Sequence, residues 1–234
     1  MELFEIAVGS LLYDRLIEFT NTFQAFRDAT GDDPDFRDPM HRAALLEWLN
    51  KWQCRQFSLE CHPLASSEIL AWYEEYRPSL LLDNVPLLDL DEQTLRSACK
   101  AYGDLMDGTA SFRSKGGAKS RVTIGPTGAS KILFALRPAA MVPWDEAMRK
   151  GLKYNGSQES YFEFLQLVRS DLTGLEKKCG LVGFKLEDLP ENIGRPRATS
   201  AQLVGEYYYL TLTRGLRTED FKRIKQYCSW SIAE

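Results

Sequence analysis

Hydrophobic residues recur at intervals of three and four along most of this chain, which is the spacing of amphipathic helices. Residues 3–27 carry one such stripe, which stops at the polar stretch TGDDPDFRDP. Asp38 followed by Pro39 then has the composition of an N-cap and a first helical position, ahead of a helix that runs through Trp52. The first 52 residues therefore predict two helices.

The next segments carry similar start and stop signals. A helix is expected from Ser66 or Ser67 to about Tyr76, because the residue before a proline disfavours helical geometry. Asp89 with Glu92 has the spacing of a capping box. The helix that this box opens has a single apolar face, formed by Leu95, Ala98, Cys99, Tyr102 and Leu105.

The second half of the chain is interpreted in the same way. Ser157 is expected to cap a long helix whose last turn holds Lys177 and Lys178. Residues 181–198 look irregular, and residues 200–215 suit a helix better than a strand because no partner strand is evident. Thr218 opens a final short helix.

Together these patterns predict an all-α fold in which residues 1–234 form a single helical unit. An alternative organisation has two lobes, 1–80 and 90–234, that share a cleft and are joined by Leu80–Asp91. The chain shows no internal repeat and no low-complexity tract.

Composition excludes several classes of protein. The chain is 44% hydrophobic and 26% charged, and it has no run of the length of a membrane span and no basic leader. Its five cysteines lack paired spacing, which favours reduced thiols and a cytoplasmic location, or a nucleoid or nuclear one if the partner is DNA. The two histidines stand apart from any ligand cluster, so we expect neither a metal nor a cofactor.

The charge is unevenly distributed along the chain. Residues 111–153 hold nine basic and two acidic side chains, a net charge of +7, so within a total of −4 the remaining residues carry −11. A basic segment on an acidic body is the pattern expected where one face meets a polyanion, although a solvated loop paired with acidic neighbours explains it equally well.

The most distinctive stretch is GPTGASKILFALRPAAMVPWDEAMRK, residues 125–150. Gly125 and Gly128 permit a tight turn before a helix, and the free N–H groups at a helix start are a ready site for phosphate. Six residues after Pro138 the chain reaches Trp144, a conceivable stacking surface for a base. Asp145 follows at an N-cap position, where backbone amides would keep a carboxylate ionised.

This stretch resembles the signature of the helix-hairpin-helix DNA glycosylases: a glycine-rich hairpin, an apolar helix and a Val-Pro-x-Asp segment. The resemblance covers about residues 115–152. In that family the hairpin binds the DNA backbone, the aspartate serves cleavage of the N-glycosidic bond, and in some members a lysine forms a Schiff base with the sugar. Asp145 takes the aspartate's place, while the lysine's place falls on Ser130, one residue before Lys131.

The resemblance implies an enzyme that binds duplex DNA as a monomer, flips a damaged or modified base and hydrolyses its bond to the sugar, in repair or in defence against modified foreign DNA. Asp145 and Lys131 are the candidate catalytic residues, and lyase activity is not expected. The expected DNA contacts are Lys115, Lys119, Arg121, Gly125, Thr127, Gly128 and Ser130.

Other interpretations remain open at this stage. Asp145 is in most proteins simply a helix cap, Lys131 a phosphate contact, and Trp144 and the run Tyr207–Tyr209 core residues, although one of those tyrosines could face a pocket. The chain as a whole could be a non-catalytic helical DNA-binding module or a helical protein–protein interaction domain.

Overall fold

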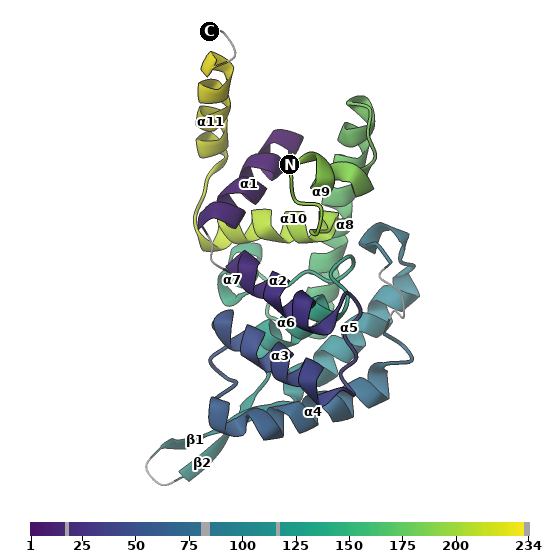
Figure 1. Cartoon of the computed structure of the whole chain (residues 1–234), viewed down its shortest axis with the longest axis vertical. Helices are drawn as coiled ribbons and strands as arrows, with labels where there is room; N and C mark the ends of the chain where they lie inside the picture. Colours follow the sequence, from purple (N-terminus) through teal and green to yellow (C-terminus); the bar gives the residue numbers. More distant parts are fainter. Residues whose placement is uncertain (17–18, 81–84, 116–117, 232–234) are drawn as a thin grey trace.

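The computed structural model describes residues 1–16, 19–80, 85–115 and 118–231. Within these ranges eleven α-helices and one two-stranded sheet make up the fold, so the expectation of a helical protein is confirmed (Figure 1). The helices are α1 Leu3–Leu16, α2 Phe19–Thr30, α3 Pro39–Lys51, α4 His62–Tyr76, α5 Glu92–Asp107, α6 Gly125–Leu136, α7 Glu146–Leu152, α8 Gln158–Leu181, α9 Leu189–Asn192, α10 Ser200–Tyr208 and α11 Thr218–Ser231.

Two helices lie where the periodicity of residues 3–27 predicted one. α1 packs against α10 from the other end of the chain, whereas α2 packs against its neighbour α3. Residues 17–18 between them are outside the described part of the structure. A hydrophobic stripe indicates that one helical face is buried. It does not indicate whether the stripe belongs to one helix or to two helices that pack on different partners.

Several helix ends are where the sequence predicts them. The Asp38 carboxylate accepts a hydrogen bond from the Met40 amide at 2.7 Å, and Ser157 Oγ accepts one from the Ser160 amide at 3.2 Å. α10 covers the segment for which a helix was preferred and continues into a π-helical turn, Tyr209–Thr213. These local signals were sufficient because each cap satisfies backbone groups of its own helix.

Two helix starts were predicted at the wrong residue. α5 is capped by Asp91, which accepts from the Thr94 amide at 2.7 Å, whereas Asp89 lies in a short 3₁₀ turn that precedes the helix. α4 begins at His62, ahead of Ser66, because a proline in its first turn suits the first helical position.

Two antiparallel strands, β1 Thr109–Lys115 and β2 Ala118–Thr123, precede Gly125, although the sequence predicted an all-α fold. The pairing escaped prediction because the hairpin has no alternation of apolar and polar residues to reveal it. Strand β2 leads directly into α6, so the turn at Gly125 joins a strand to a helix rather than a helix to a helix.

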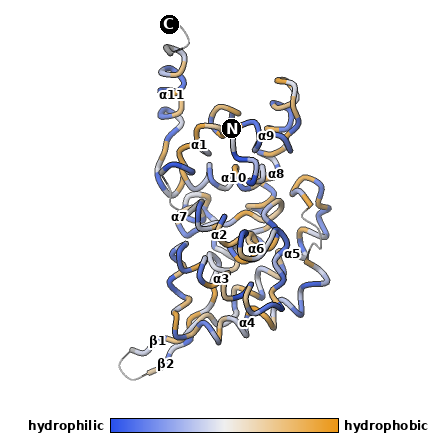
Figure 2. The backbone as a smooth tube through the Cα atoms, in the orientation of Figure 1, coloured by the Kyte–Doolittle hydropathy of each residue, from blue (hydrophilic) through white to orange (hydrophobic). Residues whose placement is uncertain are grey.

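One large hydrophobic core runs through the described part of the molecule, beside a second small cluster of Tyr13 and Leu210. It includes Leu45 of α3 and Leu165 of α8, so it spans both of the lobes considered above. Figure 1 shows α3, α4 and the hairpin towards one end of the long axis and α1, α10 and α11 towards the other, and Figure 2 shows the apolar segments distributed between them. No helix among the described residues is long and apolar enough to cross a membrane.

Candidate active site

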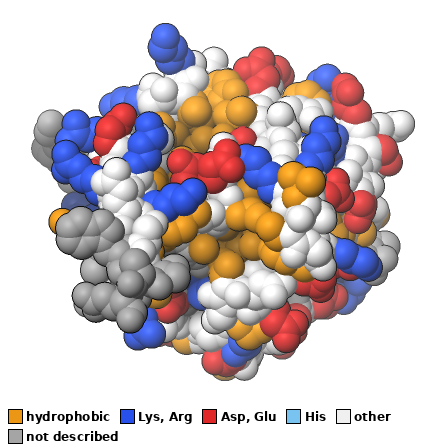
Figure 3. Space-filling view, turned by 90° about the horizontal axis from the view of Figure 1, so that it is seen from above, with side chains coloured by type: hydrophobic (Ala, Val, Ile, Leu, Met, Phe, Trp, Pro, Cys, Tyr) orange, Lys and Arg blue, Asp and Glu red, His pale blue; other side chains and the backbone are white. Residues whose placement is uncertain are grey.

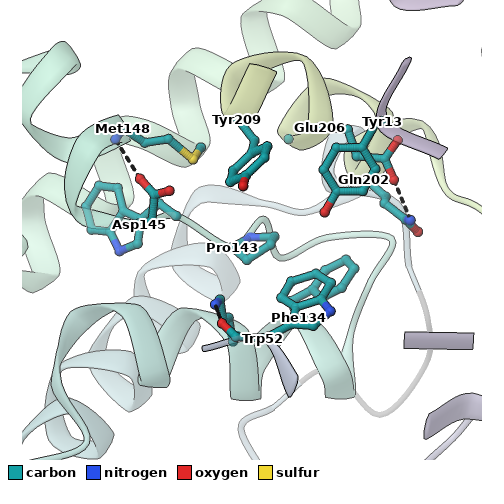
Figure 4. A pocket seen from close by; sticks show the side chains of 12 residues that line it. Tyr13, Trp52, Phe134, Pro143, Asp145, Met148, Gln202, Glu206 and Tyr209 are labelled. Atoms are coloured by element: carbon teal, nitrogen blue, oxygen red, sulfur yellow. Dashed lines mark hydrogen bonds between the residues drawn. The ribbon is translucent and has the colours of Figure 1, made fainter. Parts of the chain in front are cut away.

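One pocket brings together Lys131, Trp144 and Asp145, three residues of the stretch singled out in the sequence (Figure 4). It lies between α1 and α10 on one side and α6 with the end of α3 on the other. Its cavity volume is about 60 Å³, which is below the usual range of small-molecule sites. Residues more than 190 positions apart therefore share one cavity.

Asp145 caps α7 and is held at both carboxylate oxygens. Its Oδ1 accepts from the Met148 amide at 2.8 Å, and its Oδ2 accepts from Thr213 Oγ1 at 2.8 Å. The cap was predicted from the sequence, but the hydroxyl comes from the π-helical turn after α10, 68 residues later. Both donors are neutral, so they orient the carboxylate without cancelling its charge.

The backbone that leads to Asp145 is fixed by three helices. Ser130 Oγ on α6 accepts from the Trp144 amide at 3.2 Å, and the Tyr161 hydroxyl on α8 donates to the Val142 carbonyl at 3.0 Å. On α10, a Cβ at Gly205 would lie 2.7 Å from a Val142 methyl, so only glycine permits this approach. Asp145 is thus preorganised by elements distant in the sequence.

Lys131 contacts the end of α3 at the wall of the pocket. Its Nζ donates to the Trp52 carbonyl, at the C-terminal end of α3, at 2.8 Å, and lies 5.1 Å from the centre of the Trp52 indole. The C-terminal end of a helix carries partial negative charge, which suits an ammonium group. Lys131 therefore joins α6 to α3 at the rim of the cavity.

Aromatic side chains that the sequence analysis did not assign to a site line the rest of the pocket. Tyr13 and Tyr209 form an edge-to-face pair with ring centres 5.6 Å apart, and their hydroxyls point towards Pro143 and Phe134 (Figure 4). Burial raises the pKa of Tyr13 well above its ordinary value and also raises the pKa of Tyr209, so both remain neutral phenols. Tyr209 confirms the suggestion that one tyrosine of its run faces a pocket.

A buried charged group also borders the cavity. Glu206 is 4% exposed, its pKa is raised by burial, and its carboxylate accepts two hydrogen bonds from Arg195, at 2.9 and 3.1 Å. Gln202 donates a third at 2.8 Å. An acid inside the apolar run LVGEYYYL was the available signal for this residue in the sequence.

Trp144 does not provide the stacking surface considered for it. Its side chain is 1% exposed, and its ring packs in the core against Tyr161 and Phe164 with centres 5.0 and 5.2 Å apart. Trp52, which is 9% exposed, is the more accessible indole of the pocket. The error arose because adjacency to Asp145 in sequence does not determine which face of an extended segment turns outward.

Two of the residues expected to contact DNA are buried. Ser130 is wholly buried because it lies on the inner face of α6, and Gly128 lies inside the same helix, where a Cβ would come 2.8 Å from Gln56 Nε2. Those two expectations are wrong. Gly125 does adopt the positive φ of +68° expected of the turn, and Thr127 Oγ1 accepts from Arg149 at 3.0 Å.

The basic residues of this region are dispersed. Lys119 is exposed on β2, whereas Arg121 donates to Thr109 Oγ1 at 2.9 Å and to the Asp107 carbonyl, which fixes the base of the hairpin. Lys115 ends β1, and its side chain lies outside the described part of the structure. Arg137 is buried beside Asp33 at 3.0 Å. The net charge of +7 is therefore not displayed on one surface.

Comparisons of this chain with models of known protein families, with curated proteins and with solved structures found no match. Across the described ranges, no group of three or more His, Cys, Asp and Glu side chains is placed to hold a metal ion. The functional argument therefore depends on the pocket and on the chemistry of its residues.

Proposed function

We propose that this protein is a DNA glycosylase similar to the helix-hairpin-helix family, with strand β2 in place of the helix before the turn at Gly125, and that it hydrolyses the bond between a flipped base and its sugar. One observation supports the proposal above the others: Asp145 and Lys131 line the same cavity, whose walls are largely aromatic. The same stretch of sequence that resembles the family also builds this cavity. The biological setting would be base-excision repair or defence against foreign DNA that carries modified bases.

The pocket has the lining that a flipped base requires. Its walls include the aromatic side chains of Tyr13, Trp52, Phe134 and Tyr209. Enzymes that act on a base extrude it from the duplex and hold it between aromatic side chains and hydrogen-bonding groups. In this proposal the phenol hydroxyls of Tyr13 and Tyr209 bond the edge of such a ring.

Asp145 would stabilise the positive charge that develops on the sugar. As the base departs with the bonding electrons, C1′ acquires oxocarbenium character, and water then adds there to leave an abasic site. A carboxylate whose two oxygens are already oriented needs little reorganisation as this charge forms. The bonds from Met148 and Thr213 supply that orientation.

Lys131 serves a different role in this proposal. Its ammonium is bonded to the Trp52 carbonyl, and formation of a Schiff base would require it to leave that carbonyl and lose a proton. We therefore assign it to shaping the rim and to attracting the phosphate backbone. The enzyme is then a monofunctional glycosylase without lyase activity.

The test measures release of free base by mass spectrometry from duplexes that carry a panel of damaged and modified bases. Asp145→Asn preserves the helix cap because asparagine also accepts from the backbone, and it should reduce release by about 100-fold or more. Glu146→Gln is the matched control: this neighbouring acid is exposed and paired with Lys150, and its loss should leave the rate unchanged.

Strand breaks are scored in the same reactions, before and after alkali. Breaks that appear only after alkali agree with the role assigned to Lys131, whereas breaks without alkali that disappear in Lys131→Gln would establish a lyase. Absence of base release on every substrate, with salt-sensitive DNA binding unchanged in Asp145→Asn, would replace the enzyme by the alternative, a non-catalytic DNA-binding module. The observation that favours the alternative is that both oxygens of Asp145 already have structural partners.

A further inference from the structure

The hairpin formed by β1 and β2 projects from the body of the protein (Figure 1). Its base is buried at Thr109, Ala110 and Ser111, where β1 packs against α4. From Phe112 onward the described side chains of β1 are exposed, as are those of β2 from Ala118 to Arg121. Among the described residues, this outer part is a two-stranded ribbon that contributes no side chain to the hydrophobic core.

All the charged side chains of the hairpin are basic. Residues 109–123 contain four basic residues and no acidic residue, in a chain whose net charge is −4. Arg121 is bonded at the base of the hairpin, whereas Arg113 and Lys119 are exposed further out. Within an acidic protein, a projecting element of one sign favours an anionic partner.

The ribbon also exposes an aromatic ring. Phe112 is 44% exposed, and the ammonium of Lys119 lies 5.8 Å from the centre of its ring. Leu59, which is 75% exposed, lies on the short turn Leu59–Cys61 that contacts β1. An apolar surface framed by cations suits a partner with both phosphates and stacked bases.

We propose that this ribbon inserts into the major groove of duplex DNA, with Phe112 against the base edges and Lys119, which shares its face of the ribbon, on a phosphate. A major groove about 12 Å wide admits a two-stranded β-ribbon, and apolar side chains there contact thymine methyl groups. The inference shares with the proposed function the premise that duplex DNA is the partner, but it requires no chemistry at Asp145. Figure 3 views a different end of the molecule, on which acidic and basic side chains are mixed.

The test measures affinity for short unmodified duplexes by fluorescence anisotropy, over a series of salt concentrations. All variants are made in the full chain carrying Asp145→Asn, so that no base is released during the measurement. Phe112→Ala should weaken binding about tenfold, and Phe112→Leu should restore part of the loss. Lys119→Gln should reduce the slope of log affinity against log salt by about 1.

Matched controls come from the opposite end of the molecule. Tyr227 on α11 is 75% exposed, and Lys177 is an exposed cation near the end of α8. Tyr227→Ala and Lys177→Gln should change neither affinity nor salt slope. Thermal unfolding of every variant should match that of the parent, because each substituted side chain is exposed.

The groove is identified by competition. Methyl green, which occupies the major groove, should displace the parent protein, and distamycin, which occupies the minor groove, should not. Displacement by distamycin alone, or equal affinities for the parent and Phe112→Ala, would overturn the proposal. If Phe112→Ala weakens binding and the wild-type chain releases no base from any duplex, the ribbon proposal holds and the glycosylase proposal fails. If the wild-type chain releases base and Phe112→Ala binds DNA as tightly as the parent, the glycosylase proposal holds and the ribbon proposal fails.

Discussion

The contact between Arg195 and Glu206 makes a quantitative prediction about stability. The guanidinium donates to both oxygens of a carboxylate that is 4% exposed, at 3.1 and 2.9 Å, and also donates to Ser10 Oγ on α1 at 2.9 Å. Arg195 thereby joins the first helix to α10 at the wall of the pocket. Its side chain is itself only 13% exposed, so solvent screens the pair weakly.

Arg195→Met removes the partner and retains most of the volume. Glu206 is then left buried without its compensating charge, an arrangement that typically costs about 3–5 kcal/mol of the free energy of unfolding. The remaining hydrogen bond from Gln202 offsets only a small part of this cost. We expect the variant to fold at low temperature but to unfold at a markedly lower urea concentration near neutral pH.

The loss should depend on pH with a definite sign. Burial raises the pKa of Glu206 above its ordinary value of 4.5, while Arg195 opposes this rise, so its removal raises the pKa further. Below pH 4.5 both folded and unfolded states hold the proton, and the missing cation matters least. As pH rises above 4.5, Glu206 loses its proton in the unfolded state before it does so in the folded state. The free energy of unfolding therefore falls until the pH reaches the pKa of Glu206 in the folded state.

Urea unfolding followed by tryptophan fluorescence, from about pH 4 to about pH 8, measures this difference. The destabilisation by Arg195→Met should be smallest at the acidic end and should grow with pH. Arg195→Met combined with Glu206→Gln removes the buried charge, and its difference from Glu206→Gln alone should not vary with pH. A loss of equal size at both ends of the range would refute the reasoning.

Two further predictions concern the frame of the pocket. Thr213→Val removes the hydroxyl that donates to Asp145 Oδ2, so the rate of base release should fall about tenfold because the carboxylate is less well oriented. Thr213→Ser should restore the rate, whereas an unchanged rate in Thr213→Val would show that the hydroxyl has no role in catalysis. Gly128→Ala places a methyl group 2.8 Å from Gln56 Nε2, which should lower the free energy of unfolding in urea by about 1–3 kcal/mol. The salt dependence of DNA binding should not change. An unchanged stability with an altered salt dependence would show that Gly128 contacts DNA.

Sequence alone predicted the helices of this protein with useful accuracy. The caps at Asp38, Asp145 and Ser157 were correct because the capping side chain and the amides that it satisfies lie within a few residues of each other. The apolar face of α5 was also correct, since all five residues assigned to it are buried. Such features depend on local spacing, which is visible in a linear sequence.

The hairpin shows where local reasoning failed. The sequence ASFRSKGGAKSRV lacks the alternation of apolar and polar residues that usually marks a strand. It lacks this alternation because its outer part has no core to face. The same property that conceals the ribbon in the sequence leaves Phe112 and Lys119 exposed in the structure.

By itself, then, the sequence determined the helical class, the cap at Asp145 and the presence of Lys131 and Asp145 in one distinctive stretch. Only the tertiary structure decided that Asp145 meets Thr213 and that Lys131 turns to the end of α3. It also decided that Tyr13 and Glu206 close the cavity. The physical reason is that periodicity and caps report contacts within one helix, whereas a pocket is made by side chains from separate helices whose packing depends on the whole core.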